Sequence, residues 1–329
     1  MQCRAIKRLT AVASAAALLC LLSACSLLDE GNVFSEHREF VREHLEDNAL
    51  LERHQFAVDG LSLHYRSYGE ARDGVIIWVH GTPGSWADVG RLLVDERAAG
   101  RFKWVLIDRP GWGESRAVFT PDEGSEKKRV AHYGVYPGFD QQSRYISPLI
   151  RALRGQHPDT PILLLGHSWG ASLLPELVAD NLQQVDGALL LAGGLSPELT
   201  RPRWYNRWSR YWPLRAIIGA QLRGSNVEMY ALPDNLANIE QLWSQLDVIP
   251  MIIIQGSRDP LVDPANASFA KARLLEPAAS PRQRLLYLEG AGHLLHMQHR
   301  ELVLQCIEAL IMPAPELCRQ PAYANNHGG

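Results

Sequence analysis

The sequence predicts a doubly wound α/β fold, that is, a mostly parallel sheet with helices on both faces. Two observations predict it: six short apolar runs do not alternate with polar residues, and helix-compatible stretches lie between them. Continuous apolar runs are typical of strands buried on both faces, and their alternation with helices favours a parallel sheet. The runs are Val75–Val79, Trp104–Ile107, Ile162–Leu165, Ala188–Ala192, Met251–Ile254 and Leu285–Leu288.

An antiparallel hairpin is expected before these strands. Apolar residues alternate from Phe56 to Tyr65 around Asp59-Gly60, a dipeptide that favours a two-residue hairpin turn. In such a sheet the functional site lies beyond the carboxyl ends of the parallel strands. Helices are expected over Trp86–Ala99, Gln141–Gly155, Ala171–Leu182, Pro264–Leu275 and His296–Ile311, and insertions over 116–139 and 195–247.

The first 24 residues have the composition of a bacterial export signal. Three basic residues precede an apolar stretch from Ala11 to Leu22, which is too short to span a bilayer comfortably. The segment Leu22-Ser23-Ala24-Cys25 resembles a bacterial lipobox, whose cysteine becomes acylated with chains such as palmitate. Ser26 follows instead of Asp, which by similarity to lipoprotein sorting signals indicates the outer membrane, facing the periplasm. An ordinary signal peptide with an incidental cysteine is the alternative.

Composition limits the function classes. Without residues 1–24 the chain has 305 residues, and its 30 basic and 36 acidic side chains give a net charge of −6. Nothing in this balance suggests a nucleic-acid partner. Cys306 and Cys318 remain after export; they could pair in an oxidising periplasm, or Cys306 could stay a buried thiol, and the sequence leaves both open.

A serine lies where a strand turns sharply into a helix. Gly166-His167-Ser168-Trp169-Gly170 follows one of the apolar runs, and a serine on such a turn projects its hydroxyl away from the sheet. Flanking glycines are needed because side chains there would collide with neighbouring elements. The pattern also arises by chance, so its surroundings decide its meaning.

Two more motifs follow predicted strands: His80-Gly81-Thr82-Pro83-Gly84 and the turn from Asp108 to Ser115. With the serine turn, they resemble the α/β-hydrolase fold serine hydrolases of the branch with an H-G-x-P-G loop, over residues 55–312. The resemblance implies that the backbone N–H groups of Thr82 and Trp169 form an oxyanion hole, which stabilises negative charge on a carbonyl oxygen. It also implies that Asp108 supports its turn.

The resemblance implies a triad of Ser168, Asp259 and His293, in the chain order of this family. Asp259 follows the strand that ends near Ile254, and His293 lies on a loop of small residues after the last strand. Asp263 is the rival acid and is expected to cap the next helix instead. Asp108 and Glu198 are less favoured as the triad acid. His296 and His299 are less favoured as the triad histidine, because helical spacing assigns them to a surface or packing face.

The second insertion is rich in arginine and aromatic residues. Six arginines and no acid lie between Leu199 and Arg223. If Pro202 to Tyr211 is helical, Trp204, Trp208 and Tyr211 or Trp212 share one face, with Arg203, Arg207 and Arg210 largely opposite. This pattern is compatible with an ordinary packed helix with solvated arginines. It also suggests a surface for anionic lipid or for an acyl substrate.

The sequence therefore predicts an ester hydrolase that acts through an acyl-enzyme on small-molecule ester or acyl substrates. No metal-binding motif is present and serine chemistry needs no cofactor. Ser168 also excludes the aspartate-nucleophile relatives, the haloalkane dehalogenases and epoxide hydrolases. A peptidase resembling proline iminopeptidases and a non-catalytic envelope lipoprotein are the alternatives. The expected divisions are a signal peptide (1–24), a tether that is a solvated helix or a linker (25–54), a core (55–194 and 248–312), a lid (195–247) and a tail (313–329).

Overall fold

The computed structural model describes residues 29–98, 100–117, 133–213, 217–274, 283–312 and 317–319. The predicted signal peptide, Cys25, most of the tail and most of the first insertion lie outside the described residues.

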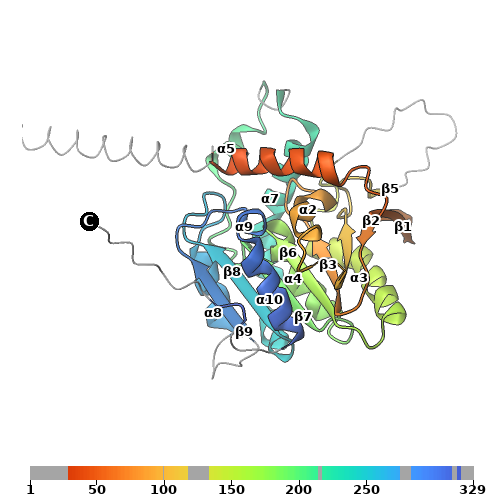
Figure 1. Ribbon diagram of the computed structural model, residues 1–329. Helices are drawn as coiled ribbons and strands as arrows, with labels where there is room; N and C mark the ends of the chain where they lie inside the picture. Colours follow the sequence, from red (N-terminus) through yellow and green to blue (C-terminus); the bar gives the residue numbers. More distant parts are fainter. Residues whose placement is uncertain are drawn as a thin grey trace, which may run out of the picture.

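A mixed sheet forms the centre of the molecule (Figure 1). Its order is β1-β2-β4-β3-β6-β7-β8-β9, with β5 paired to β2. From β4 to β9 neighbouring strands are parallel, whereas β1 and β2 are antiparallel to their neighbours. The strands are β1 (Glu52–Val58), β2 (Leu61–Tyr68), β3 (Gly74–Val79), β4 (Phe102–Ile107), β5 (Arg116–Ala117), β6 (Ile162–His167), β7 (Gly187–Leu191), β8 (Met251–Gly256) and β9 (Gln283–Leu288). The predicted doubly wound α/β fold is therefore confirmed.

The hairpin between β1 and β2 turns at the predicted dipeptide. Asp59 and Gly60 both have positive φ, 46° and 79°, as a type I′ turn requires. Val58 pairs with Leu61 directly beside the turn. The hairpin lies at one edge of the sheet, where β2 pairs with β4, the strand that ends at Ile107 just before Asp108.

Two apolar cores lie on opposite faces of the sheet. In β3, Ile77 belongs to one core, and Ile76 and Trp78 belong to the other, because successive side chains of a strand point to opposite faces. Helices α3, α4 and α8 cover the first face, and α2 and α10 cover the second. The helical elements are η1 (Trp86–Val89), α2 (Gly90–Leu93), α3 (Phe139–Gln156), α4 (Trp169–Asp180), α5 (Trp204–Trp208), α7 (Ala220–Asn238), η2 (Glu240–Val248), α8 (Ala265–Leu274), α9 (Leu295–Gln298) and α10 (Arg300–Ile311).

The segment expected as a tether contains a helix, residues 29–44, that packs on the domain. Val41 and Leu45 at its end are buried in the second core, and His37 is buried as well. A solvated helix or a linker would leave these side chains in water. Phe40, Val41 and Leu45 give this helix an apolar stripe among many charged residues, which explains why composition alone suggested a tether.

The helix considered for Pro202 to Tyr211 forms only in part. Only the five residues of α5 are helical there, and α7 and η2 supply the rest of the lid. The helix of residues 29–44, drawn in red, lies across the same end of the molecule (Figure 1). At the opposite end of the chain, Cys306 of α10 forms a disulfide with Cys318, which resolves the pairing that the sequence left open.

Candidate active site

Ser168 occupies a sharp turn between β6 and α4. Its φ of 55° and ψ of −122° are strained for any residue other than glycine. Glycines on either side permit the turn, because a Cβ at Gly170 would lie 2.1 Å from the Val79 carbonyl oxygen and one at Gly166 would lie 2.8 Å from the Gly170 oxygen. The Ser168 N–H donates to the Leu191 carbonyl at 2.8 Å, which fixes the turn to β7.

The H-G-x-P-G loop packs directly against this turn. A Cβ at Gly81 would lie 3.1 Å from the Cβ of Ser168, so the loop approaches the serine as closely as a glycine allows. Trp169 is the first residue of α4, and its N–H has no acceptor within the helix. The structure thus brings the loop of Thr82 and the first turn of α4 together beside Ser168, as the oxyanion-hole prediction requires.

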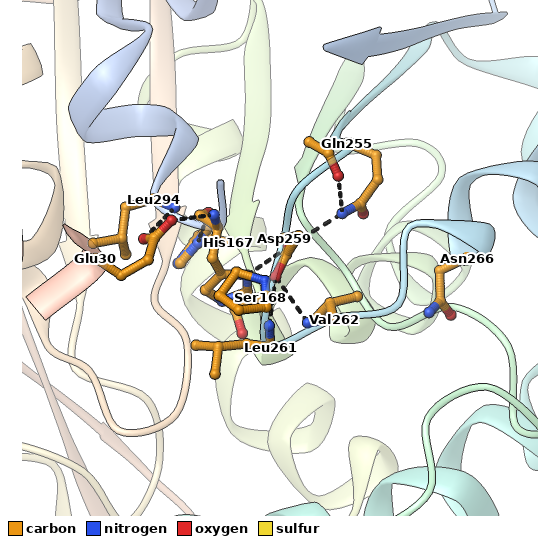
Figure 2. A network of polar contacts seen from close by, with 12 residues as sticks. Glu30, His167, Ser168, Gln255, Asp259, Leu261, Val262, Asn266 and Leu294 are labelled. Carbon is orange, nitrogen blue, oxygen red and sulfur yellow. Dashed lines mark hydrogen bonds and ion pairs between the residues drawn. The ribbon is translucent and has the colours of Figure 1, made fainter. Parts of the chain in front are cut away.

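Asp259 and His293 are joined by a short hydrogen bond from His293 Nδ1 to Asp259 Oδ2, 2.7 Å long. The other carboxylate oxygen accepts from the N–H groups of Leu261 and Val262, at 2.8 and 2.9 Å. Gln255 at the end of β8 also donates to Oδ2, at 3.1 Å. Figure 2 shows this network, with Ser168 and His167 beside Asp259.

Electrostatics keep Asp259 ionised. Burial by itself raises the pKa of this carboxyl, but the charge and hydrogen bond of His293 and the two backbone donors outweigh burial, so its pKa lies below the usual value. An ionised acid at Nδ1 directs the free lone pair of the neutral imidazole to Nε2. Within the described residues, no hydrogen bond joins His293 to Ser168. Such bonds are often long in free enzymes and tighten with substrate.

His167 holds the backbone of the His293 loop. Its Nε2 donates to the His293 carbonyl at 3.0 Å, and the two rings lie 4.7 Å apart. Burial and the nearby His293 lower the pKa of His167 to about 3, so it stays neutral. His296 is also buried, with its ring 4.3 Å from that of His167, in agreement with a packing role.

Glu30 reaches the same loop from the helix of residues 29–44. Its carboxylate accepts from the N–H of His293 at 2.6 Å and from that of Leu294 at 3.1 Å (Figure 2). Burial raises the pKa of Glu30, while the two backbone donors and the charge of His293 oppose that rise. Glu30 could not be predicted from the sequence, because nothing in its polar segment shows that it contacts a loop 263 residues away.

Arg109 and Glu228 form a buried ion pair that links the H-G-x-P-G loop to the lid. Two guanidinium nitrogens donate to the Glu228 carboxylate, at 2.8 and 3.0 Å, and both side chains are fully buried. Arg109 also donates to the carbonyls of His80 and Gly81, each at 2.9 Å. Trp112 donates to Glu228 at 2.8 Å. Arg109 thus holds the two carbonyls that precede Thr82, and Glu228 of the lid neutralises the charge of Arg109.

The rival acids lie elsewhere. Asp108 accepts from His64 at 2.9 Å and from two backbone N–H groups of its own surroundings, so it supports the turn. Asp263 accepts from the N–H of Ala265 and caps α8. Glu198 accepts from Ser196. None of the three contacts His293 in the described structure.

A small cavity of about 40 Å³ opens next to Ser168. The sequence suggested that the lid contacts substrate through Trp204, Trp208, Trp212, Arg203 and Arg207. Of these, only Arg203 lines the cavity, and Arg203 also donates to the carbonyls of Pro260 and Leu261. The tryptophans lie outside it, with exposed fractions of 73% for Trp204, 61% for Trp208 and 83% for Trp212, and Arg207 is exposed too. The lid lining that the prediction missed consists of Leu199, Thr200, Arg201, Tyr205, Met229 and Leu232.

Neither a metal cluster nor a membrane-spanning helix is found in the described parts of the chain. No group of three histidine, cysteine or acidic side chains there could hold a metal ion. No helix there is both long and apolar enough to cross a bilayer.

Comparison with known proteins gives a consistent set of relatives. The sequence profile of the alpha/beta hydrolase family matches residues 76–305. Mouse monoglyceride lipase is 24% identical over 217 residues, which cover 58% of this chain and 70% of the mouse protein. An esterase of Pyrococcus furiosus superposes with a TM-score of 0.59 at 15% identity, over 80% of this chain and 90% of the esterase. Potato epoxide hydrolase I superposes with a TM-score of 0.58 at 16% identity, over 80% and 100% of the respective chains.

Proposed function

The chain belongs to the alpha/beta hydrolase family, and on that premise we propose that it hydrolyses carboxylic esters with Ser168 as its nucleophile. One observation carries the proposal: Ser168 stands on a strained turn directly after His167, and His167 holds the carbonyl of a histidine that is hydrogen-bonded to a buried, ionised aspartate. The names of the mouse lipase and the archaeal esterase agree with ester chemistry. Serine at position 168 favours an acyl-enzyme over the aspartate chemistry of epoxide hydrolases.

The proposed reaction follows from the geometry. His293 Nε2 takes the proton of Ser168 Oγ while that oxygen bonds to the carbonyl carbon of the ester. Asp259 stabilises the resulting imidazolium, and the N–H groups of Thr82 and Trp169 donate to the negative carbonyl oxygen. His293 then protonates the leaving alcohol. A water molecule, deprotonated by the same histidine, attacks the acyl-enzyme. The acid is then released as His293 returns the proton to Ser168 Oγ.

The lid supports an ester over a peptide with a free amino terminus. A peptidase resembling proline iminopeptidases needs a free acid near the lid to bind the substrate amine. Glu228 is the fully buried acid of the lid, but Arg109 and Trp112 already occupy its oxygens. A cationic amine would have to displace a bidentate arginine, which is costly in a buried site.

The substrate assay uses p-nitrophenyl esters of increasing acyl length and aminoacyl-arylamides, with Ser168→Ala beside the parent. Ser244→Ala is the matched control, because Ser244 is exposed in η2. We expect ester turnover in the parent and the control, and none in Ser168→Ala. Turnover of amides alone would favour the peptidase. The absence of both turnover and fluorophosphonate labelling would favour a non-catalytic binding protein.

We also propose that the protein is a lipoprotein, acylated on Cys25 and held at the outer membrane. The disulfide between Cys306 and Cys318 supports an oxidising compartment. Exposed Trp204, Trp208 and Trp212, next to arginines with no acid among them, give the lid the composition of a surface for anionic lipid.

Mass spectrometry of the amino-terminal peptide tests the anchor; an unmodified Cys25 would contradict it. Vesicle binding tests the lid, with a Cys25→Ser chain that carries no acyl group. We expect binding to anionic vesicles to exceed binding to neutral ones and to weaken when the three tryptophans become serine. Equal, weak binding to both vesicles would reject the membrane role of the lid.

A further inference from the structure

The amino-terminal helix places one carboxylate on the backbone of the loop that carries His293. We propose that Glu30 is a positioning residue for His293. Through Glu30, the helix of residues 29–44 is joined to the catalytic centre. This inference rests on the proposed function, because it assumes that His293 transfers the proton. Glu30 touches no reacting atom; it acts only through the loop.

The contact is specific in its geometry. Glu30 is 8% exposed, and its two carboxylate oxygens accept from two successive N–H groups, those of His293 and Leu294. Gly292 makes room for it, because a Cβ at that position would lie 1.8 Å from Glu30 Oε1. Hydrogen bonds to an ionised acceptor are stronger than neutral ones. The loop is therefore built around this carboxylate.

The helix that carries Glu30 is itself fixed to the core. His37 Nε2 donates to the Ala87 carbonyl at 2.9 Å, and Arg91 donates to the Glu36 carbonyl at 3.3 Å. Val41 and Leu45 pack so closely on α2 that a Cβ at Gly90 would lie 2.7 Å from each of them. Glu30 is thus presented from a rigid element, which a positioning group requires.

Three partners then define where the imidazole of His293 lies. Glu30 holds its N–H, His167 holds its carbonyl, and Asp259 holds its ring. Without Glu30, the buried N–H of His293 and the partly buried N–H of Leu294 lose their acceptor, and the loop can shift. A displacement of about 1 Å in a catalytic group can cost about 100-fold in rate.

Fluorophosphonate labelling of the full chain separates positioning from folding. The number of labelled molecules reports the folded fraction, and the rate of labelling reports how well His293 activates Ser168. For Glu30→Ala we expect full labelling at a rate reduced about 10- to 100-fold, with kcat lowered in parallel and KM unchanged. Glu30→Gln keeps one acceptor oxygen and should lose less. The control is Glu43→Ala, an exposed carboxylate on the same helix, which should match the parent.

Labelling of Glu30→Ala at the parental rate would overturn the inference, and so would a loss of labelled molecules with no change in rate. A parent that never reacts would instead overturn the proposed function, and this inference with it.

Gly292→Ala gives an independent test, because Glu30→Ala should suppress its effect on the rate of labelling. The added methyl group should displace Glu30 and slow labelling in the parent. In Glu30→Ala the clashing oxygen is gone, so the same substitution should cause no further slowing. Equal slowing in both backgrounds would show that Gly292 is needed for another reason and would overturn the assigned contact.

Discussion

The buried pair of Arg109 and Glu228 yields a quantitative prediction for stability. Arg109→Met removes four hydrogen bonds, two to Glu228 and one each to the carbonyls of His80 and Gly81. Among the described residues, Trp112 is then the donor that Glu228 keeps, and Glu228 remains a buried charge. Removing one partner of a buried pair typically costs about 3–5 kcal/mol, a large part of a total stability of about 5–15 kcal/mol. We expect Arg109→Met to lower the free energy of unfolding by about 3–5 kcal/mol.

Urea unfolding, followed by circular dichroism, measures this loss for Arg109→Met, Glu228→Met and the double variant. The double variant should lose roughly 2 kcal/mol less than the sum of the two single losses, because neither charge is then left alone. Arg72→Met, which breaks an exposed pair with Glu70, should change little. If the loss in the double variant equals the sum of the two single losses within about 0.5 kcal/mol, the coupling between the lid and the H-G-x-P-G loop is refuted.

Acid should destabilise the fold, because burial lowers the pKa of His80 and of His167 to about 3. Below about pH 6.5 the unfolded chain binds protons at these two histidines and the folded chain does not, so the free energy of unfolding should fall from pH 6.5 towards pH 3. The fall should be less steep in His167→Gln. An unchanged slope in that variant would contradict the assignment. Reduction of the disulfide, whose cysteines are 12 residues apart, should lower the free energy of unfolding by up to ~3 kcal/mol, and a Cys306→Ser/Cys318→Ser chain should not respond to reductant. Gly170→Ala should yield little folded protein because its methyl group meets the Val79 carbonyl, whereas Gly155→Ala, with open space around it, should express like the parent; equal yields would count against the packed turn.

Much of the fold and the geometry of the predicted site could be read from the sequence, because both depend on local patterns. Strands buried on both faces need continuous apolar runs, and Asp59-Gly60 carries the positive φ angles of the hairpin turn. The motifs follow particular strands, and parallel strands bring their carboxyl ends to one edge of the sheet. That rule predicted that the site lies at this edge, and the family resemblance assigned Asp259 and His293 to it; the structure joins these two side chains by a hydrogen bond.

The remaining contacts could not be predicted, because they join segments that share no local signal. Arg109 and Glu228 are 119 residues apart, and each alone reads as an ordinary charged residue. The extent of the helix in the lid could not be predicted either, because periodicity from Pro202 to Tyr211 does not reveal that α5 ends at Trp208. Its tryptophans remain exposed, and only short helical structure forms.

The position of the helix of residues 29–44 matters for recombinant work on this protein. The family profile begins at residue 76, so a fragment trimmed to that boundary would keep Ser168, Asp259 and His293 but lose the edge hairpin and Glu30. Even a fragment that starts at β1 would uncover the surface on which Val41 and Leu45 pack. An expressed fragment should therefore begin before Asp29. Affinity tags should be placed elsewhere than at that end, because a tag there would lie close to the His293 loop.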